Sequence, residues 1–249
     1  MQKQFFLFRG LIREAKHWGD FPEHILKEFP GSEIITIDIP GAGVLYKSTS
    51  PLSIKGMVEL MRQVYLEKVK DDHEQILVAV SLGGMISAEW MRSYPQDFDS
   101  AVLINTSYGG ISPMFDRLMP KALLHVLKVP RLKGRDKEEH ILNLVKNHAQ
   151  NFKETLDLWE DIESKRPVSV KNALRQIIAA AKFRVGNWKP SIPILLLGST
   201  QDRMVSINCS RKISKEWKLP LYEHPTGGHD LTSDDPEWVA KKINHLFEQ

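Results

Sequence analysis

The stretch Gln75–Met85, QILVAVSLGGM, decides the fold of this chain. It opens on a run of apolar and β-branched residues, 76–80, which predicts a buried strand. Ser81 follows at once, and a pair of glycines then begins a pattern of helical periodicity that continues to about Tyr94. The stretch therefore predicts a strand, a tight turn at the serine and a helix.

The turn at Ser81 requires small neighbours, because large side chains beside it would collide. Ala79 and Gly83 flank the serine at a distance of two residues. A small residue, any residue, serine, any residue and glycine between a strand and a helix is the layout of a nucleophile elbow. Such a turn lifts the serine to the edge of the sheet, beside helix N–H groups that have no acceptor within the helix. A plain turn can carry the same five-residue pattern, so a catalytic reading requires partner residues in the correct order.

Composition and length predict one large domain. The chain has 249 residues, enough for a substantial core. Its single cysteine, Cys209, excludes an internal disulfide and fits a reducing compartment. The N-terminal apolar run is too short for a signal peptide, and no run reaches the length of a membrane span. We therefore expect a cytoplasmic protein with no membrane span.

Strand patterns alternate with helical patterns along most of the chain, which predicts an α/β fold with a mostly parallel sheet between helices. The expected strands are 4–8, 33–37, 76–80, 101–105, 194–197 and 221–223. Apolar residues in 107–189 recur instead at spacings of three and four, which predicts helices. We expect residues 1–106 and 190–249 to form an α/β core. Residues 107–189 are expected to form an inserted, all-helical lid over the C-terminal edge of the sheet, where such sheets bind ligands.

Two loops beyond predicted strands supply the partners that a serine nucleophile needs. A serine hydroxyl requires a base, and the base requires a carboxylate that orients it. Asp202 and His229 each lie just beyond a predicted strand, and His224 is a rival base close to His229. Asp230 is expected to tether the histidine loop. The order Ser81, Asp202, His229 is the order of the triad in an α/β-hydrolase.

With these loops the chain resembles the α/β-hydrolase superfamily over essentially its whole length, in the serine esterase and lipase branch with a helical lid. The Gly-Gly-His-Asp sequence matches the histidine loop of the family, which favours His229 over His224. The other acid position of the family lies at the end of the strand before the lid, where this chain has Asn105. Asp202 therefore has no rival there. The sheet is expected to lack the N-terminal hairpin of many relatives.

The resemblance also implies an oxyanion hole, in which two N–H groups stabilise the negative charge of the tetrahedral intermediate. The backbone N–H groups of Leu82 and Leu11 are the donors that the family pattern indicates. Relatives typically have His-Gly-x in the loop after the first strand, whereas this chain has Arg9-Gly10-Leu11. Arg9 is expected either to organise that loop through hydrogen bonds or to bind an anionic group of the substrate.

Positive charge is concentrated in the predicted lid. The formal net charge of the chain is +3, yet residues 112–190 contain 16 Lys and Arg against 9 Asp and Glu. The basic run consists of Lys121, Lys128, Arg131, Lys133, Arg135 and Lys137. It is either a solvated face or a docking site for an acidic carrier protein that presents acyl chains. Candidate residues for an apolar acyl pocket are Met114, Phe115, Leu118 and Trp159, with packing between lid helices as the alternative.

We therefore expect a serine hydrolase that cleaves a carboxylic ester or thioester of a small to medium acyl substrate through an acyl-enzyme, with no cofactor and no metal. The sequence contains no phosphate-binding or dinucleotide-binding loop and no recognisable nucleic-acid motif, so nucleic acid is not an expected partner. Two other classes remain open. The same triad can serve a lyase, a C–C hydrolase or an acyltransferase, and a non-catalytic binding module can use the same fold.

Overall fold

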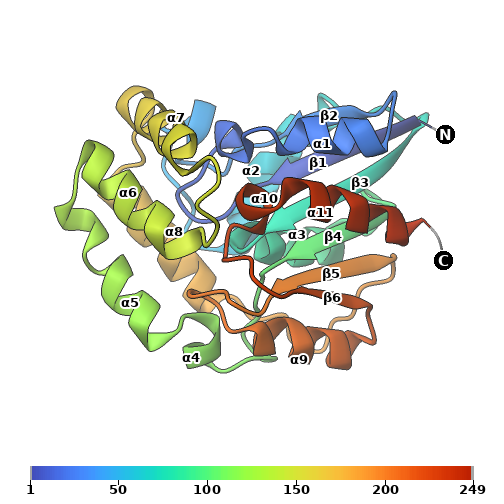
Figure 1. Ribbon diagram of the computed structural model, residues 1–249. Coiled ribbons are helices and arrows are strands. Elements are labelled where there is room, and N and C mark those ends of the chain that lie inside the picture. Colours follow the sequence, from blue (N-terminus) through green and yellow to red (C-terminus); the bar gives the residue numbers. More distant parts are fainter. Residues whose placement is uncertain (1, 248–249) are drawn as a thin grey trace.

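A six-stranded sheet runs through the centre of the computed structural model, which describes residues 2–247 (Figure 1). Its strands lie in the order β2-β1-β3-β4-β5-β6, and every neighbouring pair is parallel. Their bounds are β1 Gln2–Phe8, β2 Glu33–Thr36, β3 His73–Val80, β4 Ser100–Ile104, β5 Ile194–Ser199 and β6 Leu221–His224. The predicted mostly parallel sheet is confirmed.

Helices cover both faces of the sheet. One face packs against α2 (Ile54–Leu66), α3 (Leu82–Ser93) and α9 (Ile207–Trp217), and the other against α1 (Phe21–Glu28) and α11 (Pro236–Ile243). Successive residues of a strand point to opposite faces. Phe6 and Phe8 of β1 therefore enter the first core, while Phe5 and Leu7 enter the second. Burial on both faces explains why these strands are continuous apolar runs rather than alternating ones.

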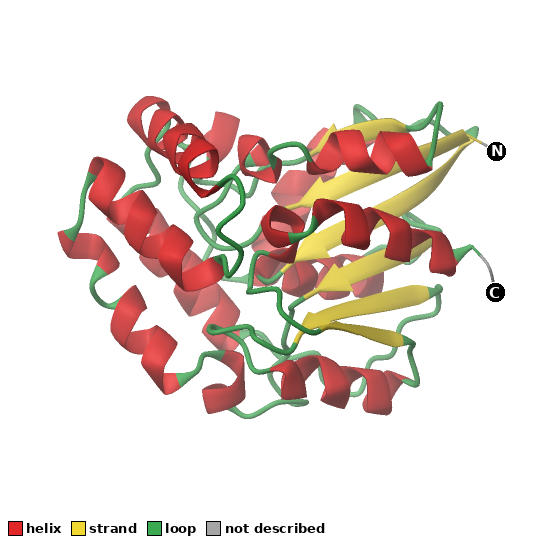
Figure 2. Ribbon diagram, viewed as in Figure 1, coloured by secondary structure: helices red, strands yellow, loops and turns green. Residues whose placement is uncertain are grey.

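A segment of helices separates β4 from β5, and we refer to residues 107–189 as the cap. Its helices are α4 (Met114–Arg117), α5 (Pro120–Val126), η3 (Val129–Arg131), α6 (Gly134–Val145), α7 (Phe152–Lys165) and α8 (Val170–Lys182). Figure 2 shows them beyond the arrowheads of the strands, at the carboxyl edge of the sheet. Within the described residues, the β pairing of the cap is limited to an isolated bridge between Gly109 and Arg184. The predicted helical character of this segment is therefore observed.

Four short helical turns complete the part of the chain that the structure describes: η1 (Ala15–Trp18), η2 (Gly43–Leu45), α10 (Leu231–Asp234) and η4 (Asn244–Leu246). Of these, η1 follows the loop after β1, and α10 follows the loop after β6. Both loops lie at the same carboxyl edge as the cap, because parallel strands end on one side of a sheet. No helix within residues 2–247 is long and apolar enough to cross a membrane.

Candidate active site

Ser81 occupies the turn between β3 and α3 in a strained backbone conformation. Its φ and ψ are 57° and −117°, and such sparsely populated conformations cost a residue other than glycine about 1–3 kcal/mol. The surrounding contacts hold it there. The Ser81 N–H donates to the Ile104 carbonyl at 2.9 Å, and Thr106 Oγ1 donates to the Ser81 carbonyl at 2.8 Å. A Cβ at Gly83 would lie 2.4 Å from the Phe8 carbonyl oxygen, so glycine is required at that position.

Asp202 and His229 form a buried hydrogen-bonded pair beside this turn. His229 Nδ1 lies 2.7 Å from Asp202 Oδ2. The other carboxylate oxygen, Oδ1, accepts the N–H groups of Met204 and Val205 at 2.7 and 3.0 Å, which fixes the carboxylate. An ionised carboxylate only accepts hydrogen bonds, so the proton lies on Nδ1 and the lone pair of Nε2 remains available as a base. His229 and Ser81 line the same cavity.

The pKa of His229 lies above its ordinary value of 6.5. Burial disfavours the charged imidazolium and lowers the pKa, but the negative charge and the hydrogen bond of Asp202 outweigh that effect. The charge of Asp230 raises it further, and the charge of Arg9 opposes it. The site therefore stabilises the imidazolium that would form when His229 accepts a proton.

Asn105 has a role that the sequence did not reveal. It follows β4 at the position where relatives carry the alternative acid, it is buried, and its φ is 46°. Its Oδ1 accepts the Ser199 N–H at 2.8 Å, and its Nδ2 donates to the carbonyls of Gly228 and His229 at 3.1 and 2.9 Å. An amide can donate and accept at once, which a carboxylate cannot. Asn105 therefore ties the end of β5 to the histidine loop.

Of the two candidate histidines, His229 lines the cavity of Ser81 and His224 does not. His224 Nδ1 accepts the Gly227 N–H at 2.8 Å, its Nε2 lies 3.2 Å from Asp235 Oδ2, and its ring packs edge-on against Trp238. These contacts fix the start of the histidine loop, residues 225–230 between β6 and α10. His229 is the histidine that shares the cavity with the serine.

Arg9 links the loop after β1 to the histidine loop. Its guanidinium forms a bidentate ion pair with Asp230, with Nη1–Oδ1 and Nη2–Oδ2 distances of 3.0 and 2.5 Å, and also donates to Thr232 at 3.2 Å. Burial raises the pKa of Asp230, but the positive charge of Arg9 outweighs burial and holds that pKa below its ordinary value. Of the two expected roles, organisation of the loop is the one these contacts support. Asp230, as predicted, holds the histidine loop in place.

Replacing Asp230 with alanine is expected to lower the free energy of unfolding by about 3–5 kcal/mol, because Arg9 would be left buried and unpaired. Urea unfolding followed by circular dichroism measures this loss. The double variant Arg9→Met/Asp230→Leu, which removes both charges, is expected to lose much less stability. Equal losses in the single and double variants would show that packing, and not the ion pair, joins the two loops.

The loop after β1 also packs directly against the nucleophile turn. A Cβ at Gly10 would lie 3.2 Å from Ser81 Cβ, and Gly10 and Leu11 both line the cavity. Leu82 is the first residue of α3, whose first-turn N–H groups have no acceptor within the helix. The two backbone segments expected to form an oxyanion hole therefore both lie close to Ser81.

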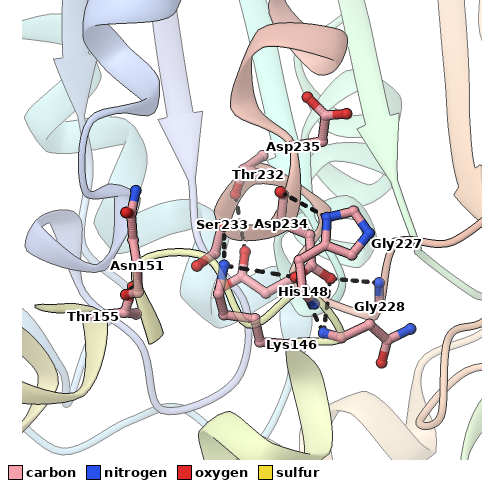
Figure 3. Close-up of polar contacts among 12 residues, drawn as sticks. Lys146, His148, Asn151, Thr155, Gly227, Gly228, Thr232, Ser233, Asp234 and Asp235 are labelled. Atoms are coloured by element: carbon pink, nitrogen blue, oxygen red, sulfur yellow. Dashed lines mark hydrogen bonds and ion pairs between the residues drawn. The ribbon is translucent and has the colours of Figure 1, made fainter. Parts of the chain in front are cut away.

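Asp234 fastens the cap to the histidine loop (Figure 3). Its buried carboxylate accepts hydrogen bonds from the backbone N–H groups of Asn147 and His148, at 3.0 and 2.8 Å. These two cap residues come shortly after α6. The same carboxylate also accepts the N–H of Gly228, the residue before His229, at 2.6 Å. Lys146 Nζ lies 3.6 Å from Asp234 Oδ1 and is itself almost fully buried.

Asn147 extends this connection to the loop of Asp202. Its Nδ2 donates to the carbonyls of Gln201 and Thr226 at 3.0 and 3.1 Å, and Arg203 donates to the Lys146 carbonyl at 2.7 Å. The cap residues after α6 therefore contact both loops that carry the triad partners. We refer to Lys146, Asn147, His148 and Asp234 as the cap clamp.

Replacing Asp234 with asparagine is expected to lower kcat by about tenfold to a hundredfold, because the amide would turn a donor toward several N–H groups and displace the residue before His229. Activity assays on the folded protein measure this change in kcat. Asp97→Asn is the control, since Asp97 pairs with Arg62 far from the histidine loop and should lower stability without lowering kcat. Equal kcat values for the two variants would contradict a positioning role of the cap clamp.

A cavity of about 500 Å³ opens onto Ser81 and His229 between the core and the cap. Its wall is mainly apolar, and the larger aliphatic side chains in it are those of Leu11, Ile12, Val80, Val126, Val129, Leu132, Ile141, Leu144, Val145, Val168, Val170, Leu174, Ile177 and Met204. Such dimensions suit a small-molecule site. No cluster of three or more His, Cys, Asp or Glu within residues 2–247 is arranged to hold a metal ion.

The structure places the four cap residues predicted for the acyl pocket away from this cavity. Met114 and Phe115 of α4 are exposed to solvent. Leu118 packs against the internal core of the cap, and Trp159 lies within that core, where its ring meets the Arg13 guanidinium at 4.0 Å. Arg9 is the one predicted substrate-binding residue that lines the cavity, with its charge already paired.

The fold and the family match define the class: this chain is an α/β-hydrolase. Residues 16–236 match the family described as serine aminopeptidase, S33, and the chain belongs to that family. No curated protein matches the chain by sequence.

Several solved structures share the fold. The esterase RhEst1 from Rhodococcus sp. ECU1013 has a TM-score of 0.76 at 15% identity, over 100% of this chain and 91% of that one. The 2-hydroxy-6-oxo-6-phenylhexa-2,4-dienoate hydrolase BphD from Rhodococcus sp. strain RHA1 has a TM-score of 0.78 at 15% identity, over 100% and 91%. A lipase-esterase related protein from Clostridium acetobutylicum ATCC 824 has a TM-score of 0.72 at 17% identity, over 98% and 94%. At these identities the likeness is one of fold.

Proposed function

We propose that this protein is a serine hydrolase that cleaves carboxylic esters or thioesters of aliphatic acyl groups. The observation that carries the proposal is the arrangement of Ser81 and His229 on the wall of one aliphatic cavity, with His229 hydrogen-bonded at 2.7 Å to the buried Asp202. The esterase and lipase-related structures that share the fold support the same reaction class. The cytoplasmic location predicted from the single cysteine is part of this proposal.

In the proposed mechanism, Ser81 Oγ attacks the acyl carbonyl carbon while His229 Nε2 accepts the hydroxyl proton. Asp202 holds the imidazole and stabilises its charged form, and the backbone N–H groups of Leu11 and Leu82 stabilise the oxyanion. His229 then protonates the leaving alcohol or thiol, which departs and leaves an acyl-enzyme on Ser81. His229 then takes a proton from water, whose oxygen attacks the acyl carbon, and returns that proton to Ser81 Oγ as the bond to the acyl group breaks and the carboxylic acid leaves. The aliphatic wall of the cavity holds the acyl chain throughout.

The charges in the cavity favour an acyl substrate over a peptide with a free amino terminus. Binding an ammonium group in a pocket requires a carboxylate that is free to pair with it. The two carboxylates that line this cavity within residues 2–247 are both paired, Asp230 with Arg9 and Glu163 with Lys137 at 2.6 Å. We therefore do not propose aminopeptidase activity, despite the description of the family.

A substrate series tests this choice directly. p-Nitrophenyl esters from acetyl to palmitoyl, the matching acyl thioesters of coenzyme A, and aminoacyl p-nitroanilides are compared at equal concentration, with the Ser81→Ala variant as background. We expect turnover of esters or thioesters with an optimum set by chain length, and none of the nitroanilides. Faster cleavage of the nitroanilides would contradict the proposal and indicate an aminopeptidase.

The pH profile gives a separate test of His229. The imidazole must be neutral to accept the Ser81 proton, so kcat/KM is expected to fall as pH decreases through the pKa of His229. Because Asp202 holds that pKa above the ordinary 6.5, the midpoint of the acid limb is expected above pH 6.5. A midpoint below 6.5, measured with two esters of different leaving groups, would contradict the assignment of His229 as the base.

A further inference from the structure

Most large apolar side chains that are exposed within residues 2–247 lie in the cap. On α5 and just after it these are Leu123, Leu124 and Leu127, of which Leu124 and Leu127 are 63% and 56% exposed. On α8 they are Val170, Leu174 and Ile178, which follow one another at a spacing of four and so share one face of the helix. Figure 1 shows α5 at the outer edge of the cap, far from the sheet.

The same region carries positive charge without compensating acid. No Asp or Glu occurs between Arg117 and Arg135. Arg135 and Lys137, which begin α6, are paired with acids of α7, Arg135 with Asp157 and Glu160 and Lys137 with Glu163. The side chains of Lys121, Lys128 and Lys133 are exposed and have no ion-pair partner in the described part of the chain. The segment 118–134, which includes α5 and η3, therefore carries positive charge that no acid within the segment compensates.

Part of this surface borders the opening of the cavity. Residues that are both exposed and part of the cavity wall mark that opening, and they include Pro130, Lys133, Val170 and Leu174. Val126 and Val129, from the same segment as the exposed leucines, line the interior. An apolar path therefore leads from the exposed face, past the opening, to Ser81. We refer to Leu123, Leu124, Leu127, Lys121, Lys128, Lys133, Val170 and Leu174 as the mouth surface.

We propose that the mouth surface docks on an anionic lipid surface. Exposed leucines mixed with unpaired lysines are the composition of segments that lie in a membrane interface, where the apolar side chains enter the acyl boundary and the cations meet lipid phosphates. Docking would place the cavity opening against the acyl chains of the bilayer. That the docked enzyme draws its acyl substrate from the bilayer rests on the proposed function; the docking itself does not.

A lipid surface explains the two observations together better than an acidic carrier protein does. A carrier would neutralise the lysines, but two of the six basic residues first considered for it, Arg135 and Lys137, already have acidic partners within the cap. A bilayer supplies an apolar phase for the exposed leucines of both α5 and α8 as well as phosphates for the lysines.

Vesicle co-sedimentation of the full chain tests the proposal, using the Ser81→Ala variant so that the result does not depend on catalysis. We expect binding to phosphatidylglycerol vesicles, weaker binding as salt increases, and at least about tenfold weaker binding to phosphatidylcholine vesicles. Adding Leu127→Gln and Lys128→Gln is expected to weaken binding to the anionic vesicles about tenfold or more. In the otherwise wild-type enzyme the same pair should leave turnover of a short, water-soluble ester unchanged, which also shows that the variant folds.

The matched control is Leu66→Gln with Lys68→Gln at the end of α2, which again replaces one exposed leucine and one exposed lysine. This control variant is expected to bind phosphatidylglycerol vesicles as tightly as the protein with an intact mouth surface. No binding to anionic vesicles, or equal loss in both pairs of substitutions, would overturn the proposal. So would a dimer in solution, or a complex with an acidic acyl carrier protein, that depends on Leu127 and Lys128 while vesicles are not bound. Vesicle binding without ester turnover by the wild-type enzyme would leave the docking intact and refute the proposed function alone.

Discussion

Replacing Ser81 with alanine is expected to lower kcat for the preferred ester about a millionfold, to the rate that the remaining site supports without a nucleophile. The hydroxyl is the one group in the proposed mechanism that forms a covalent bond to the substrate. Single-turnover assays with a p-nitrophenyl ester measure the loss, and KM is expected to change little because the cavity wall is unaltered.

The control for this variant is Ser107→Ala. Ser107 lies just beyond β4 at the same edge of the sheet, is buried, and its hydroxyl lacks a hydrogen-bond partner in residues 2–247. Removing that hydroxyl is expected to leave kcat unchanged. If Ser81→Ala retained most of the activity while Ser107→Ala did not, the elbow serine would not be the nucleophile.

Replacing Asp202 with asparagine is expected to lower kcat about ten-thousandfold. An asparagine amide directed at His229 Nδ1 would donate to it, so the proton would move to Nε2. Nε2 could then no longer accept the Ser81 proton, as the proposed mechanism requires. The lost negative charge should also lower the pKa of His229, because the charge of Asp202 is what raises it against burial. The acid limb of the residual activity is therefore expected to shift to lower pH.

The chain contains a matched control for this second prediction, the His224–Asp235 pair. Its Nε2–Oδ2 distance is 3.2 Å, and it lies outside the cavity. Asp235 also caps α11 by accepting the Trp238 N–H, a bond that asparagine can keep. Asp235→Asn should change kcat no more than a few-fold. A large loss of kcat in Asp235→Asn, or a small loss of kcat in Asp202→Asn, would contradict the assignment of Asp202 as the carboxylate that orients the base.

The three members of the proposed triad could be predicted from the sequence because each follows a strand of the parallel sheet. Strands buried on both faces are the strongest short-range pattern in an α/β chain, and parallel strands end at one edge, so Ser81, Asp202 and His229 had to come near one another. Strand ends were predicted less well. β3 begins at His73, three residues before the apolar run, because its polar start pairs with the polar start of β1.

The supporting residues could not be predicted, because their partners are distant in the sequence. Asn105 bonds to the carbonyls of Gly228 and His229, and Asp234 bonds to Asn147 and His148 in the cap. An isolated asparagine or aspartate after a strand carries no signal for such contacts. The one sequence signal at this position is that related chains have an acidic residue where this chain has Asn105.

The acyl pocket was mispredicted for a similar physical reason. Helical periodicity shows which residues share a face, but it does not show whether that face meets the cavity, the core of the cap or solvent. Trp159 turned to the core of the cap, and Phe115 to solvent, while branched residues of α5, α6 and α8 formed the wall. Substrate preference therefore follows from how the cap helices pack, which the local pattern does not determine.

Labelling with a fluorophosphonate probe, mapped by mass spectrometry, tests the central claim most directly. The probe reacts with a serine only when a base and an oxyanion hole activate it. We predict one modified residue, Ser81, and loss of the label in Ser81→Ala and in His229→Ala while Ser107→Ala is labelled as the wild type. Folded protein that remains unlabelled at Ser81, or labelling at Ser81 that persists without His229, would contradict an activated serine at this elbow.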